Sequence, residues 1–387
     1  MAQYRLVHSL FMSESPFDYG STVSSETFTN REEDANRLST NLLSGINTTL
    51  ISPRRWGKSS LVEKVSKDML KKEKKLAIVN LDLFSVKDEA GFLQLFAREV
   101  IKASSSKWED RLQTAKTIFK QLIPKLSVSV DPNSDISLSF DWNELERHSD
   151  EILNLPETIA EKKSIRFIVC IDEFQQLAMV SGYSHLEKKM RAAWQRHKKV
   201  TYCLYGSKRH MMEEIFNNPS KPFYRFGDVM MLKKIAQEKW VSFICERFAS
   251  TGKSIAPEDA RSIAALMQNH SWYVQQLAHY TWNYTKKVAR AKEVESALEE
   301  LLRTNSPFFQ REIELMAMGQ LNLLKVIAAG ETMLTSQRVM KEFRLGTPRS
   351  IIKNKETLMK HDIIERSENK YVFLDPVFEI WFRRLIH

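Results

Sequence analysis

The sequence lacks any apolar run long enough to cross a membrane, and its first residues lack the apolar core of a secretory signal. It also lacks internal repeats and low-complexity stretches. The cysteines lie in apolar surroundings without the spacing of metal ligands, and they are Cys170, Cys203 and Cys245. We therefore expect a cytoplasmic protein with reduced thiols, no membrane contact and two or three globular domains in its 387 residues.

The sequence has too few acidic residues to balance its basic ones, and the formal net charge is +10. Such a charge can indicate nucleic-acid binding. Much of the excess lies in two local runs, residues 71–75 and 188–199, and runs of this kind are typical of solvated helix faces. A bound triphosphate would explain a few more of the positive charges, so the net charge alone does not identify a partner.

Residues 49–61 have the pattern of a phosphate-binding loop between a strand and a helix. Glycine lets backbone N–H groups turn towards phosphate oxygens, Lys58 adds a charge for the β- and γ-phosphates, and the Ser59 hydroxyl can hold Mg²⁺. The pattern G-x-x-x-x-G-K-[ST] is incomplete, because Ser52 stands at its first glycine. The alternative is a Lys-Ser turn on a basic surface. The residues predicted to bind phosphate are Pro53, Arg54, Arg55, Trp56, Gly57, Lys58, Ser59 and Ser60.

A second segment, residues 167–173, reads as a buried strand that ends in two carboxylates. In phosphoryl transfer, Asp172 would hold Mg²⁺ together with Ser59, and Glu173 would orient and deprotonate the attacking water. Alone, an Asp-Glu pair could simply end a strand and begin a helix. Together with the loop around Lys58 it indicates a nucleoside triphosphate and hydrolysis. The sequence has no Asn-Lys-x-Asp guanine box, which favours ATP over GTP.

Further strands are expected at 76–83, 200–205 and 228–232, so residues 28–235 should form an α/β core around a parallel sheet. Alternating residues at 126–140 predict an inserted β-hairpin. Residues 1–27 read as an extended lead-in. Ser207 follows the strand at 200–205, where a polar side chain can sense the γ-phosphate, although a turn or helix-capping serine would look the same.

Amphipathic helical patterns fill residues 236–312 and predict an all-α lid. Residues 313–387 follow the order helix, helix, helix, hairpin, which is typical of a winged helix. Its third helix carries Arg349, Lys353, Lys355 and Lys360, which suits a helix near phosphates. A protein-binding role fits this domain as well, because aromatic and base-reading side chains are sparse.

With these motifs, nearly the whole chain resembles the archaeal-type ATPase family, in the STAND branch of AAA+-like P-loop NTPases of the ASCE class. The similar segments are residues 28–32, 52–60, 82–92, 171–175, 206–207, 221–225, 269–275 and the C-terminal winged helix. The resemblance implies that Phe28, Asn30 and Arg31 lie near the adenine. It also implies that Arg225 contacts the γ-phosphate, within the chain or from a neighbouring subunit, although a surface arginine is the alternative.

By the same resemblance, His270 belongs to a lid motif that couples the lid to the nucleotide, and here Ser271 replaces the proline of that motif. We expect a slow, Mg²⁺-dependent ATPase that acts as a nucleotide-controlled switch, with Lys58, Glu173, Arg225 and Ser207 in the reaction. A duplex DNA or protein partner of the winged helix and a homo-oligomer fit this expectation. The alternatives are an ATP-regulated DNA-binding regulator and a scaffold that holds nucleotide without hydrolysis.

Overall fold

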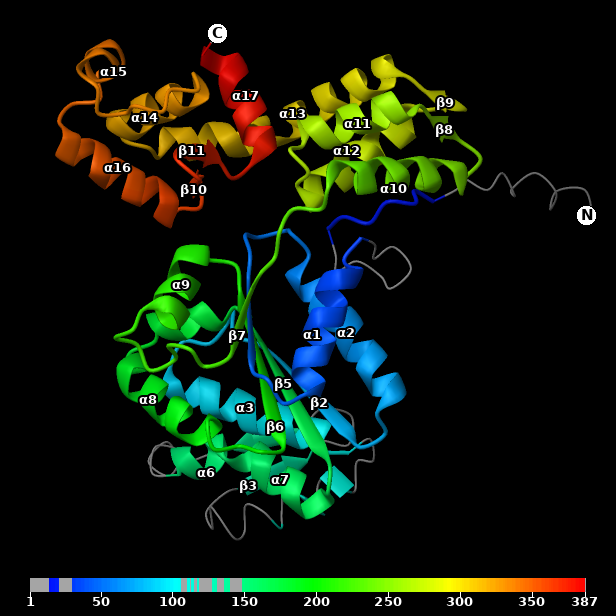
Figure 1. Ribbon diagram of the computed structural model, residues 1–387, viewed down its shortest axis with the longest axis vertical. Coiled ribbons are helices and arrows are strands. Elements are labelled where there is room, and N and C mark those ends of the chain that lie inside the picture. The colour runs from blue at the N-terminus through cyan, green and yellow to red at the C-terminus, as the bar shows by residue number, and fades with distance from the viewer. Residues whose placement is uncertain are drawn as a thin grey trace, which may run out of the picture. The chain divides into compact units, whose positions relative to one another are not determined.

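The computed structural model describes residues 14–20, 30–105, 110, 111, 113, 114, 117, 127–130, 136–139 and 148–386. Its contacts divide the chain into two compact units (Figure 1). The first unit is Arg31–Lys233, and the second combines Met1–Asn30 with Lys234–His387.

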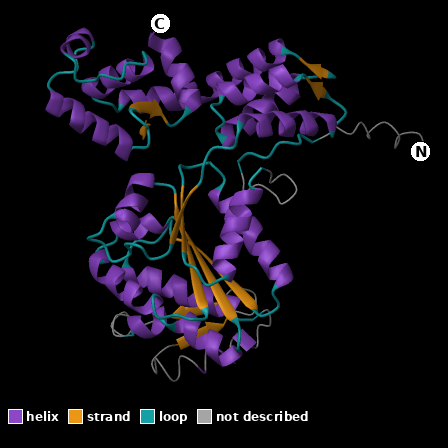
Figure 2. Cartoon of the chain, viewed as in Figure 1, coloured by secondary structure: helices purple, strands orange, loops and turns teal. Residues whose placement is uncertain are grey.

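The first unit is built around one five-stranded sheet with the order β2-β5-β6-β1-β7 (Figure 2). Every neighbouring pair in this sheet is parallel, which confirms the predicted parallel α/β core. Two strands that follow each other in the sequence, β1 and β2, lie at separate places in the sheet. The strands are β1 (Thr48–Ile51), β2 (Leu76–Asp82), β5 (Arg166–Asp172), β6 (Val200–Gly206) and β7 (Asp228–Met231).

Helices cover both faces of this sheet, as their apolar faces require. The seven residues of β6, the central strand, are all buried, whereas the edge strand β2 alternates between buried and more exposed residues. On one face, the ring of Trp194 stacks on Tyr202 and Phe96. The helices are α1 (Glu32–Leu43), α2 (Lys58–Lys72), α3 (Glu89–Ala103), α6 (Ser149–Leu153), α7 (Leu155–Lys163), the 3₁₀ helix η1 (Phe174–Met179), α8 (Tyr183–Trp194) and α9 (Arg209–Asn217).

The inserted hairpin also forms. Strands β3 (Ser127–Val130) and β4 (Ile136–Ser139) pair antiparallel, within the predicted range of 126–140. The residues that join them lie outside the described part of the chain.

The second unit begins with four long helices, α10 (Gln237–Ala249), α11 (Pro257–Leu266), α12 (Ser271–Tyr284) and α13 (Ala291–Glu314). This region is not purely helical, because β8 (Ser254–Ile255) and β9 (Val288–Ala289) form a short parallel pair. The two-residue strands are too short to leave an alternating pattern in the sequence. Helix α13 contains Pro307 and ends only at Glu314. The expected boundary between the all-α lid and the winged helix, at 312/313, therefore falls inside this helix.

The winged-helix region follows the predicted order. It consists of α14 (Met318–Ala328), α15 (Gln337–Glu342), α16 (Pro348–Lys360), β10 (Ile364–Ser367), β11 (Lys370–Phe373) and α17 (Pro376–Ile386). Thr347 caps α16 by accepting a hydrogen bond from Ser350 N, and Pro348 occupies the first turn. Ser336 caps α15 by accepting a hydrogen bond from Val339 N.

The N-terminal segment 14–20, part of the expected extended lead-in, packs on the helices of the second unit. Phe17 is buried against the rings of Phe243 and Phe248. The amide N–H of Asp18 donates to the side chain of Gln275 in α12. Extended backbone therefore contributes to the core of the helical unit.

Inside this unit, the Tyr273 hydroxyl in α12 donates a hydrogen bond to Asp375, which directly precedes α17 of the winged-helix region. The other oxygen of Asp375 accepts from the N–H groups of Val377 and Phe378 at the start of α17. Tyr273 is 3 % exposed.

We predict that Tyr273→Phe lowers the free energy of unfolding by about 1–2 kcal/mol, because the half-buried carboxylate of Asp375 loses a donor. Urea unfolding of the full chain measures the shift. Tyr284→Phe is the matched control, because its hydroxyl bonds to Glu300 on the surface and should contribute less than about 0.5 kcal/mol. Equal effects of the two substitutions would contradict the structural role of Tyr273.

Candidate phosphate-binding site

The loop that follows β1 has the backbone geometry of a phosphate cradle. Gly57 has φ 91° and caps α2, which begins at Lys58, so the helix N-terminus points into the loop. Arg55 also has a positive φ, of 64°. Ser52, which stands at the first glycine of the pattern, does not have a positive φ. A glycine is therefore not required at this position for the loop to adopt its backbone conformation.

Lys58 lies inside this loop and is 6 % exposed. Its ammonium donates to the carbonyl oxygens of Ser52, at 3.0 Å, and Pro53, at 3.2 Å. Burial lowers the pKa of Lys58 to about 8, and the nearby carboxylates of Asp172 and Glu173 only partly offset this effect. The charge is thus held in place by the loop itself.

Ser59 and Asp172 meet at the other side of the loop. The Ser59 hydroxyl donates to Asp172 Oδ2 at 2.7 Å, across 113 residues of sequence. Burial raises the pKa of Asp172 above its ordinary value. A hydroxyl and a carboxylate are hard oxygen ligands, which fit Mg²⁺. No cluster of three or more histidine, cysteine or acidic side chains suited to a metal occurs in the described residues, so Mg²⁺ here would take its other ligands from water or phosphate.

Glu173 is held by two neighbours. Its Oε2 accepts a hydrogen bond from the Ser207 hydroxyl at 2.8 Å and another from the Gln175 amide. Its backbone has φ 51°, a conformation that non-glycine residues rarely adopt. The carboxylate of Glu173 is therefore placed by contacts from β6 and η1.

Gln175 is the functional candidate that the sequence did not single out. It is fully buried, and a Cβ on Gly206 would lie 1.9 Å from its Oε1. The glycine in β6 thus makes room for the amide that contacts Glu173. The signal available in the sequence was a polar side chain two residues after Glu173, in a segment that also contains Phe174, Leu177 and Met179.

Two arginines connect the loop to other parts of the first unit. The Arg54 guanidinium contacts Ser207 Oγ at 3.3 Å. Arg31, at the start of α1, donates to the carbonyl oxygen of Trp56 at 3.0 Å and to that of Lys233 at 2.5 Å. It is 5 % exposed and also pairs with Asp34, so its contacts in this structure are to protein groups.

Three other residues predicted to contact the nucleotide lie outside the first unit. Phe28 lies outside the described residues. Asn30 and His270 belong to the second unit, where Asn30 donates to Lys239 O and the buried His270 precedes α12 beside the Tyr273 ring. Their relation to the loop stays a prediction.

Arg225 is exposed, and its guanidinium lies 5.2 Å from the ring centre of Tyr224. Two residues later, Gly227 packs against the backbone of Asn47, just before β1 begins. The phosphate-binding loop follows the other end of β1. The structure therefore does not bring Arg225 to the loop of its own chain.

Comparisons with known proteins agree with this geometry. Residues 56–178 match the model of the KAP family P-loop domain, and residues 307–384 match a model described as "Probable winged helix domain". No curated protein matches the sequence.

Two solved structures share the fold over almost their full length. A Walker-type ATPase of Pyrococcus abyssi superposes with a TM-score of 0.66 at 18% identity, over 95% of this chain and 99% of that chain. The ORC2 protein of Aeropyrum pernix, in ADPNP–ADP complexes, gives 0.58 at 13% identity, over 96% of each chain. The predicted fold is thereby confirmed: a P-loop NTPase fold with a parallel sheet is followed by a C-terminal winged-helix domain.

Proposed function

We propose that this protein is an ATP-binding, Mg²⁺-dependent ATPase that works as a slow nucleotide-controlled switch. The observation that carries the proposal is the hydrogen bond between Ser59 and Asp172, beside the buried ammonium of Lys58. A loop hydroxyl, a strand-end carboxylate and a lysine then converge where a triphosphate and its metal would bind. The adenine nucleotides in the similar ORC2 structure support ATP as the nucleotide.

In this proposal, the N–H groups of the loop and Lys58 bind the β- and γ-phosphates. Ser59 and Asp172 hold Mg²⁺, which neutralises charge on the phosphates. Glu173 accepts the proton of the attacking water, and Gln175 and Ser207 keep its carboxylate in position. Ser207 contacts both Glu173 and Arg54, and these contacts support its proposed role in sensing the γ-phosphate.

The second unit is proposed to transmit the nucleotide state to a protein or DNA partner. Its lid helices and winged-helix region are joined by Tyr273–Asp375 and by Gln268, whose amide donates to Glu379 at 2.6 Å. These bonds favour movement of the unit as one piece. Arg225 is exposed and could reach a neighbouring copy of the chain. We therefore favour a contact of Arg225 with the nucleotide of a neighbouring subunit over a contact within its own chain.

The affinity for nucleotide should fall as the pH rises above 8. Burial places the pKa of free Lys58 at about 8, and bound phosphates raise that pKa, so binding takes up a proton above pH 8. By linkage, the affinity for nucleotide should then fall about tenfold for each pH unit above 8. Titration with a fluorescent ADP between pH 8 and 9.5, where the ADP phosphates are already ionised, measures it.

Lys58→Arg is the control for this prediction, because a guanidinium stays charged throughout this range. Its affinity should be nearly independent of pH, whatever its absolute value. A flat profile for the wild-type protein would contradict the assignment of Lys58 as the phosphate ligand.

Glu173→Gln should keep ATP binding and slow phosphate release by at least ~100-fold, because an amide cannot accept the proton of water. Phosphate release with and without Mg²⁺ measures the effect. Glu213→Gln, an exposed change on α9, should leave turnover unchanged. Normal turnover in Glu173→Gln would show that another group activates water, and nucleotide bound without release in either protein would favour the scaffold alternative.

The exposed face of α16 favours a second candidate function, DNA binding by the winged helix. Arg349, Lys353 and Lys360 are exposed on this helix, whereas Ile351 and Leu358 are buried in the core. Such a face suits contact with DNA phosphates, in which case ATP would only set the conformation.

If α16 contacts duplex DNA, Arg349→Ala with Lys353→Ala should reduce the slope of log K against log salt by about 2, one unit for each lost phosphate contact. Fluorescence anisotropy at several salt concentrations measures the slope. The control is Lys286→Ala with Lys287→Ala, which removes two exposed charges before β9. Equal losses in both variants, or no binding at low salt, would refute this candidate.

A further inference from the structure

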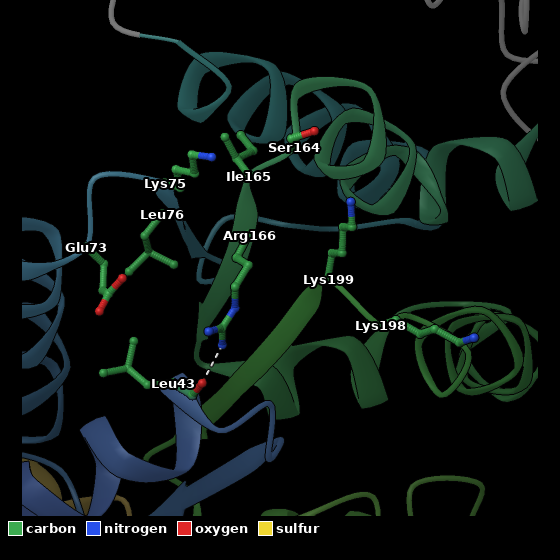
Figure 3. Close-up of a pocket in the computed structure, with 9 residues that line it drawn as sticks. All are labelled: Leu43, Glu73, Lys75, Leu76, Ser164, Ile165, Arg166, Lys198 and Lys199. Atoms are coloured by element: carbon green, nitrogen blue, oxygen red, sulfur yellow. Dashed lines mark hydrogen bonds between the residues drawn. The ribbon is translucent and has the colours of Figure 1, made fainter.

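A pocket of about 330 Å³ opens in the first unit at the edge of the sheet where β2, β5 and β6 begin (Figure 3). Three apolar side chains, Leu43, Leu76 and Ile165, form part of its lining. The phosphate-binding loop follows the opposite edge. Strands β5 and β6 have seven residues each, which separates the two edges by roughly 20 Å.

The charged lining of this strand-entry pocket is strongly basic. It contains Lys75, Arg166, Lys198 and Lys199, against one carboxylate, Glu73. The lysines belong to the two basic runs, residues 71–75 and 188–199, whose pattern is typical of solvated helix faces. The structure instead brings parts of both runs to one concave site, more than 120 residues apart in the sequence.

The backbone beneath these charges is fixed. Arg166 Nη2 donates to the carbonyl oxygen of Leu43 at 2.6 Å, as the dashed line in Figure 3 shows. The carboxylate of Glu157 accepts hydrogen bonds from the backbone N–H groups of Lys198, at 2.9 Å, and Lys199, at 3.0 and 3.2 Å. These hydrogen bonds hold the guanidinium of Arg166 and the backbone of Lys198 and Lys199 in place.

Several cationic groups in the lining are available to a ligand. Within the described part of the chain, neither Lys75 nor Lys199 uses its ammonium in a hydrogen bond or an ion pair. Arg166 donates from Nη2 to the end of α1, and among the described residues its Nε and Nη1 groups make no hydrogen bond. These donors, in a concave site with apolar walls, are what an anion with an organic body requires.

We propose that the strand-entry pocket binds a phosphomonoester carried on a small apolar or planar group. A phosphomonoester dianion balances the excess of cations better than a single carboxylate does. Leu43, Leu76 and Ile165 then contact the organic group. This ligand is distinct from the nucleotide at the loop, and the inference does not rest on the proposed ATPase function.

The test is calorimetric titration of the full chain with phenyl phosphate, in a Lys58→Ala background that disables the other candidate phosphate site. Lys75→Gln with Lys199→Gln should weaken binding at least ~10-fold, because two charge-assisted contacts are lost. Lys71→Gln with Lys72→Gln is the matched control. It removes two exposed charges from the end of α2 that do not line the pocket, and it should change the affinity less than about twofold.

Equal losses in the two double variants, or no saturable binding in the millimolar range, would overturn the proposal. Benzoate, which has the same ring and a carboxylate, should bind more weakly, and equal binding would overturn the choice of phosphate. A free small phosphomonoester and the 5′-phosphate end of a nucleic acid present the same group. Comparison of phenyl phosphate with a tetranucleotide, 5′-phosphorylated or not, distinguishes these two sources, and a preference for either phosphorylated probe supports the site.

Discussion

The contact between Ser59 and Asp172 requires the ends of two strands that are not neighbours to reach one point. Ser59 follows β1 and Asp172 ends β5, and the sheet order places β6 between them. The intervening strand is buried along its whole length, and the residue after it, Ser207, contacts Glu173. The sheet order therefore decides which three chain segments can share the site, and the rest of the first unit maintains that order.

Burial of the charges at this edge explains why the site is ready before a ligand arrives. Lys58 is almost out of contact with water, which costs free energy that the carbonyl oxygens of Ser52 and Pro53 partly offset. A phosphate group would meet a lysine that is already desolvated and oriented, so little reorganisation is needed on binding. The same burial raises the pKa of Asp172, so a bound cation would stabilise its ionised form.

The sequence predicted the elements whose evidence is local. Apolar runs predicted the strands, and the order of glycine, lysine and serine predicted the loop. It could not predict contacts made across long stretches of chain, such as that of Arg31 with Lys233, 202 residues away. For the same reason, the basic runs looked like separate helix faces until the fold placed parts of them in one pocket. The role of Gln175 also depended on packing, because only the close approach of Gly206 shows where its amide lies.

Arg31 links the loop to both ends of the first unit. It is the first residue of that unit, it binds the carbonyl oxygen of Trp56 in the loop, and it binds that of Lys233, the last residue. Because this guanidinium is buried, a shift of the loop backbone at Trp56 cannot be absorbed by solvent and has to be met by the arginine and its other partners. In the proposed switch, the points where the chain enters and leaves the first unit are therefore the first places to respond to nucleotide.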